Sequence, residues 1–124
     1  MRHTARNITT TVLSLATLLG ALLLTPFQAS AAGATAVEKG KAVAVNRKKG
    51  NCLACHAMED GTLPGNIGPP LVAMKARYPD KAKLRAQIWD ATAPNPNSIM
   101  PPFGRHRLLS EEEIDQITEY VYTL

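Results

Sequence analysis

The stretch Cys52-Leu53-Ala54-Cys55-His56 decides the fold that we expect for this chain. Two thiols three residues apart fit one helical turn, and they can add to the two vinyl groups of a single haem. The adjoining His56 is then held under the iron as its proximal ligand. The motif therefore predicts one c-type haem, attached through Cys52 and Cys55.

Two other uses of a Cys-x-x-Cys pair fit this sequence less well. A thioredoxin-like redox pair lies in βαβ surroundings, and the chain has no strand pattern long enough to suggest them. A zinc site needs further Cys or His at close spacing. These are the only two cysteines, and beyond the first 31 residues the only histidine besides His56 is His106. Haem attachment is therefore the favoured interpretation.

The first 31 residues have the three parts of a secretory signal. Their start is basic, residues 12–24 form an apolar run, and residues 29–31 are Ala-Ser-Ala, which a signal peptidase accepts. The apolar run is too short for a membrane span, which needs about 20 residues. We therefore expect residues 1–31 to be cleaved, and residues 32–124 to form one periplasmic haem domain without a membrane span.

Charge and composition exclude several classes of protein. The chain has 124 residues and a formal charge of +4, which falls to +2 once Arg2 and Arg6 leave with the signal. It has no basic stripe and only 5% aromatic residues, so we expect no nucleic-acid binding. Two cysteines cannot build a framework of several disulfides, and a domain this small buries little surface. A large apolar cofactor at its centre would complete the core.

The remaining sequence predicts an all-α domain with long loops. Helical or short apolar patterns cover four segments: residues 37–49, 71–78, 81–91 and 110–124. The last is the clearest, because Ser110 and Glu113 form a capping box before apolar residues at helical spacing. Asp80 can cap the third segment. The Gly- and Pro-rich residues 57–70 and 93–104 predict loops.

Four residues could bind the second face of the iron: Met58, Met74, Met100 and His106. Met58 lies too close to His56 in sequence to reach the opposite face. Met74 falls in an apolar segment, where methionine is usually core filler, and two arginines flank His106. Met100 precedes two prolines in a stiff loop, which lowers the entropy of holding its thioether on iron. We expect Met100 to be the ligand; the alternative is a loop methionine that packs on the haem.

Further positions are expected around the haem. The Gly-Pro-Pro-Leu turn can present the carbonyl of Pro69 to the free N–H of the proximal histidine, and it also stiffens the loop. Trp89 packs either against the haem, with its indole N–H near a propionate, or within the core alone. Arg47, Lys48 and Lys49 either ring an exposed haem edge and attract an acidic partner, or form a solvated helix end.

The layout of the chain resembles class I cytochrome c over residues 37–124. The resemblance implies three to five helices wrapped around one covalent haem c, with Gly40 packed closely against Tyr120. It also agrees with His56 and Met100 as axial ligands. Such ligation leaves no open coordination position and raises the reduction potential, as in a small periplasmic electron carrier.

A narrower resemblance is to the SoxX cytochromes of bacterial sulfur oxidation. It is carried by four stretches: Asn-Cys-Leu-Ala-Cys-His at 51–56, Gly-Asn-Ile-Gly-Pro-Pro-Leu at 65–71, Met-Pro-Pro-Phe-Gly at 100–104 and His-Arg-Leu-Leu-Ser at 106–110. The resemblance implies a heterodimer with a SoxA-like haem subunit that carries the catalytic cysteine. That complex couples thiosulfate oxidatively to a cysteine of the SoxYZ carrier, and this subunit passes the electrons to a further cytochrome c.

Two other functions stay open at this point. One is a free-standing cytochrome that feeds a terminal oxidase, which would behave as a monomer. The other is a haem enzyme or gas sensor, which would need an open or easily lost sixth ligand.

Overall fold

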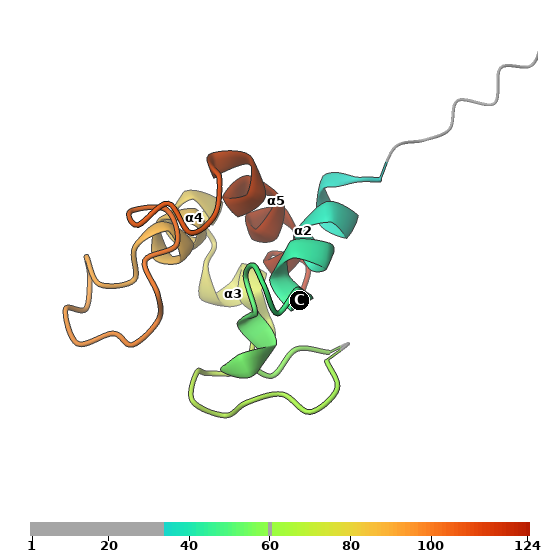
Figure 1. Ribbon diagram of the computed structural model, residues 1–124, viewed down its shortest axis with the longest axis horizontal. Helices are drawn as coiled ribbons and strands as arrows, with labels where there is room; N and C mark the ends of the chain where they lie inside the picture. Colours follow the sequence, from blue (N-terminus) through green and yellow to red (C-terminus); the bar gives the residue numbers. More distant parts are fainter. Residues whose placement is uncertain (1–33, 60) are drawn as a thin grey trace, which may run out of the picture. The chain divides into compact units, whose positions relative to one another are not determined.

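The computed structural model describes residues 34–59 and 61–124, so the expected signal peptide lies outside the described residues. The elements, in chain order, are α2 (Ala36–Val45), the 3₁₀ turn η1 (Cys52–Ala54), α3 (Met74–Arg77), α4 (Lys81–Trp89) and α5 (Glu111–Val121). Figure 1 shows these helices joined by long loops. The described residues contain no strand, so the all-α prediction is confirmed.

Helix α2 begins and ends earlier than expected. Thr35 and Glu38 form a capping box, in which the Thr35 hydroxyl accepts from the Glu38 N–H at 3.2 Å. The Ser/Thr-x-x-Glu signal was present in the sequence but was missed. The helix ends at Val45 rather than at residue 49, because Asn46 is extended and its side chain accepts from the Lys48 N–H at 2.9 Å.

Helices α2 and α5 lie against each other (Figure 1). Gly40 of α2 lies where the two helices come close together. A Cβ added there would lie 1.9 Å from the carbonyl oxygen of Gln116, so only glycine allows this approach. Ala44, one turn further on the same face, is completely buried. Close packing of the two helices at Gly40 is present, but the nearest atoms belong to Gln116 and Ile117, one turn before the expected Tyr120.

Helices α4 and α5 form the other helix pair around the core. The predicted caps are confirmed: Asp80 accepts from the Ala82 N–H at 2.9 Å, and Ser110 accepts from the Glu113 N–H at 3.2 Å. Apolar residues of the two helices are buried together: Leu84, Ile88, Ile114, Ile117 and Val121. No helix in the described part of the chain is long and apolar enough to cross a bilayer.

Candidate haem site

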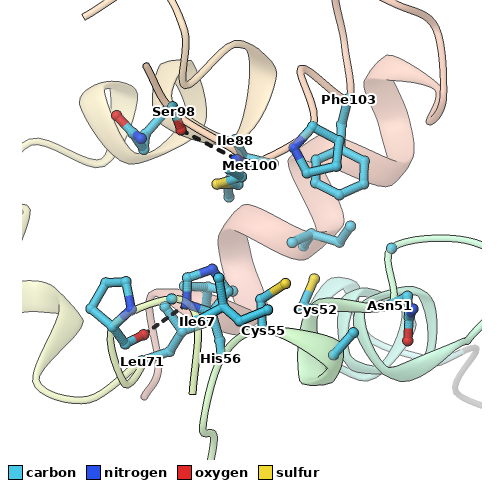
Figure 2. A pocket seen from close by; sticks show the side chains of 18 of the residues that line it. Asn51, Cys52, Cys55, His56, Ile67, Leu71, Ile88, Ser98, Met100 and Phe103 are labelled. Carbon is cyan, nitrogen blue, oxygen red and sulfur yellow. Dashed lines mark hydrogen bonds between the residues drawn. The ribbon is translucent and has the colours of Figure 1, made fainter. Parts of the chain in front are cut away.

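A cavity of about 710 Å³ lies between the loop that precedes α3 and the loop that follows α4. Its apolar lining includes Leu71, Met74, Leu84, Ile88, Phe103 and Ile117. In Figure 2, His56 and Met100 stand on opposite sides of the cavity, and the Cys52 and Cys55 sulfurs lie on the same side as His56. A space of this size is typical of sites for sizeable organic ligands.

One side of the cavity is built by residues 51–59 and 61–71, which we call the His56 wall. Its motif folds as the short turn η1, in which the N–H groups of Cys55 and His56 donate to the Cys52 carbonyl at 3.1 and 2.9 Å. The loop that follows is tied back by Gly68, whose N–H donates to the Cys55 carbonyl at 2.8 Å. Backbone hydrogen bonds therefore fix the position of the imidazole.

His56 is also held in orientation. Its Nδ1 lies 2.7 Å from the carbonyl oxygen of Pro69, as expected from the sequence. Because a carbonyl oxygen only accepts hydrogen bonds, Nδ1 carries the proton, and the lone pair of Nε2 stays free to bind a metal. A Cβ on Gly68 would come within 2.4 Å of the imidazole ring, so the backbone lies directly against its face.

Both cysteines are free and partly buried. Burial raises the pKa of the Cys52 thiol to about 11, so it is neutral at ordinary pH. Metal binding by cysteine requires the thiolate. A neutral thiol in an apolar wall suits bond formation with an apolar cofactor better than coordination of a cation.

The opposite side is the loop of residues 91–104, which we call the Met100 wall. The Met100 N–H donates to the Ser98 hydroxyl at 3.3 Å, and its side chain is half-buried (Figure 2). Phe103 is buried beside it in the lining. This wall has four prolines and few internal hydrogen bonds among its described residues.

The other candidates for the second ligand lie elsewhere. Met58 is buried in the core and does not line the cavity. Met74 is 1% exposed and lines it, but its sulfur is also the acceptor of a 3.4 Å contact from Arg77. His106 is exposed and does not line the cavity. Of the four, Met100 is the one that faces His56.

Trp89 does not line the cavity, so of the two places expected for it, the one against the haem is wrong. It packs within the protein instead, with its ring against the backbone of Gly104. Arg47, Lys48 and Lys49 do line the cavity, and Lys49 also pairs with Glu113.

Sequence reasoning missed a fourth cation in the lining, Arg77, which donates to the Pro70 carbonyl at 2.7 Å. Arg77 could have been found from the sequence, because it follows the Gly-Pro-Pro-Leu turn closely along the chain. The described lining residues include four cations and no carboxylate, so the cavity is electropositive.

The donor set fits a c-type haem. An imidazole and a thioether face each other, two thiols lie beside the imidazole, and the lining is mostly apolar. A haem held in this way supplies one-electron redox chemistry. The chain contributes attachment, orientation of His56 and exclusion of water.

Comparisons with known proteins agree with this geometry. A family model described as cytochrome C oxidase, cbb3-type, subunit III matches residues 35–121. An uncharacterized lipoprotein of Aquifex aeolicus (strain VF5) is 38% identical over 76 residues, which are 60% of this chain and 37% of the relative. The chain therefore spans little more than a third of that relative's length.

A solved structure shares the fold. The crystal structure of SoxXA from P. pantotrophus superposes with a TM-score of 0.63 at 24% identity, over 70% of this chain and 80% of the solved one. The predicted class I cytochrome c fold is thereby confirmed. Because the family model matches most of its length, the chain belongs to the cytochrome c family described as cbb3-type oxidase subunit III and carries covalent haem c.

Proposed function

We propose that this chain is a monohaem electron-transfer cytochrome with Cys52 and Cys55 as the attachment sites and His56 and Met100 as axial ligands. The observation that carries the proposal is the placement of His56 and Met100 on opposite sides of one cavity that also receives both thiols. With both axial positions filled by protein, the iron transfers electrons and leaves no position for a substrate.

The ligand assignment is tested by the weak sulfur-to-iron charge-transfer band of the ferric protein in the far red. The wild-type protein should show the band, and Met100→Ala should abolish it. Met74→Leu and His106→Ala are the matched controls and should keep it. If either control loses the band while Met100→Ala retains it, the assignment is wrong.

We further propose that the chain is exported to the periplasm and loses residues 1–31. The support is the three-part leader and the family's covalent haem, which bacteria attach outside the cytoplasm. Mass spectrometry of the protein from its native source should find one haem added to a chain that starts near Ala32. A mass without haem, or one that keeps the leader, would contradict this.

The chain's place in metabolism is proposed from its resemblance to SoxX and from the fold shared with SoxXA. We assign it the role of electron-accepting subunit beside a SoxA-like haem protein. Coupling thiosulfate to a carrier cysteine forms a sulfur–sulfur bond and releases two electrons and the thiol proton. Both cysteines of this chain are taken by haem, so the reactive cysteine belongs to the partner and the sulfur acceptor to a SoxYZ-like carrier.

The surface offered to that partner is the rim of the cavity. Ile67, Ile99 and Leu108 line the cavity, so they would stand beside the haem edge that must come close to a second haem for electron transfer. Arg47 and Lys48 at the same rim favour a partner with acidic groups.

The family match favours a second candidate, a free-standing carrier or oxidase-associated cytochrome that delivers electrons to a terminal oxidase. A reconstitution separates the two. Under the first proposal, reduction of this haem requires the SoxA-like partner, the carrier and thiosulfate together, and His56 or Met100 variants slow it without preventing association. No association at micromolar concentration would leave the free-standing carrier.

A further inference from the structure

The Met100 wall is closed at its base by two contacts between its last residue, Gly104, and Trp89, which lies just before the wall. The N–H of Gly104 donates to the carbonyl oxygen of Trp89 at 3.0 Å. The indole of Trp89 lies so close to Gly104 that a Cβ there would come within 2.1 Å of the ring. Arg85 lies over the same indole, with its guanidinium carbon 5.4 Å from the ring centroid. The end of α4 and the end of the loop are therefore packed together.

A buried carboxylate adds a second closure. Asp90, 8% exposed, accepts from the N–H and the hydroxyl of Thr92 at 2.9 and 2.5 Å. Its other oxygen accepts from Arg105 at 3.1 Å, and Arg105 also donates to the Thr92 hydroxyl at 3.3 Å. Asp90 and Thr92 stand at the start of the Met100 wall, and Arg105 stands just after its end. The ion pair therefore ties both ends of the loop.

We propose that Asp90 and Arg105 are positioning residues that hold the Met100 wall closed and so set how readily the Met100 thioether leaves the iron. The inference rests on the proposed ligation by Met100. Within the loop, the hydrogen bonds near Met100 are local ones, from its own N–H to the Ser98 hydroxyl and from the Ser98 N–H to the Asn95 carbonyl, so its position depends on how the ends of the loop are held. Opening the base lets the loop move without unfolding the helices.

The proposal predicts that an added ligand competes with Met100 for the iron. An added ligand binds iron only in molecules whose loop has opened, so its apparent affinity rises in proportion to the open fraction. Asp90→Asn keeps the size of the side chain and an acceptor for Thr92 but removes the charge that holds Arg105. Ferric Asp90→Asn should bind imidazole about tenfold more tightly than the wild type, as expected if the open fraction rises tenfold.

The matched control is Glu119→Gln, which breaks the 2.9 Å ion pair with Lys81 between α4 and α5, away from the loop. It should leave imidazole binding within about twofold of the wild type. Arg105→Gln should reproduce Asp90→Asn, and the double variant should add little, because the two residues act through one contact. Equal imidazole affinities in Asp90→Asn and Glu119→Gln would overturn the proposal.

Amide hydrogen exchange provides a readout that does not depend on the ligand. Exchange over residues 91–103 should accelerate in Asp90→Asn and Arg105→Gln, while α2 and α5 stay protected as in Glu119→Gln. Acceleration throughout the domain would mean general destabilisation and would overturn the positioning role. If the wild type lacks the far-red band, the ligation by Met100 fails, and the exchange pattern still decides whether Asp90 closes the loop.

Discussion

The two walls of the cavity are held in different ways. The His56 wall is held by contacts within its own segment, in which Gly68 and Pro69 bind Cys55 and His56, 13 residues earlier in the chain. The Met100 wall has little internal bonding and is secured at its ends. Each wall contains a glycine packed against a ring: Gly68 under His56, and Gly104 against Trp89.

Because of this difference, we expect the two walls to affect different properties of the haem site. A wall built from its own backbone can form as soon as its short segment folds. A wall fixed only at its ends depends on α4 and on the segment before α5 being in place. We therefore expect changes in the His56 wall to affect whether the haem is held at all, and changes in the Met100 wall to affect how its second ligand behaves.

The strongest test of the comparison is to remove the attachment. Cys52→Ser combined with Cys55→Ser should yield a chain without covalent haem. Without the haem, the apolar lining of the cavity would be exposed to water, and a domain this small has little other surface to bury. Without haem, the variant should therefore lose its cooperative unfolding transition, as measured by circular dichroism.

The control for the double variant is Ala54→Ser, an exposed position in the same turn that should keep both haem and fold. A haem-free chain that still unfolded cooperatively would show that the helices alone make a stable domain.

The next largest effect is expected at the His56 wall. Gly68→Ala places a Cβ 2.4 Å from an imidazole that Pro69 already holds, so the ring or the backbone must move. We expect a loss of about 1–3 kcal/mol in the free energy of unfolding, together with poorer haem incorporation. Chemical denaturation and the ratio of haem absorbance to protein would measure the two.

Gly61→Ala is the matched control in the same loop, because its nearest contact is the flexible Leu53 side chain. It should cost clearly less than Gly68→Ala. Equal losses in the two variants would mean that the His56 wall tolerates movement, against the comparison.

Sequence reasoning reached the His56 wall more fully than the Met100 wall, and the reason is the presence of a motif rather than distance along the chain. The hydrogen bond from His56 to Pro69 spans 13 residues, yet it was predicted, because a proximal histidine needs a carbonyl acceptor and the Gly-Pro-Pro-Leu turn offers one. The cap at Ser110 was predicted from its capping box. The pairing of Asp90 with Arg105 spans 15 residues and was not predicted, because no motif indicates how the proline-rich loop returns. For the same reason, the two places expected for Trp89 stayed open until the structure showed its ring against Gly104.

A smaller effect is expected at the Met100 wall. Gly104→Ala places a Cβ 2.1 Å from the Trp89 ring, which is half-buried and does not line the cavity. The haem should stay attached and the overall stability should fall by about 1 kcal/mol, at the low end of overpacking effects. The far-red band should weaken at a lower temperature than in the wild type. A normal band together with poor haem incorporation would reverse the assigned roles of the two walls.

The smallest effect should come from acid, and it should act on the Met100 wall. Hydrogen bonds from Thr92 and then the pairing with Arg105 hold the pKa of Asp90 below its ordinary value. A group whose pKa is lowered by folding stabilises the folded state fully above its unfolded pKa, near 3.9, and loses that contribution as the pH falls through its folded pKa. Protonated Asp90 then resembles asparagine, because neither carries the charge that holds Arg105.

The temperature at which the far-red band disappears should therefore be lower in Asp90→Asn than in the wild type at pH 7, and the two should converge at acid pH. Glu119→Gln keeps Asp90, so its band should disappear at the same temperature as in the wild type, both at pH 7 and at acid pH. A difference between Asp90→Asn and the wild type that persists unchanged in acid would show that the carboxylate's charge is not what closes the loop.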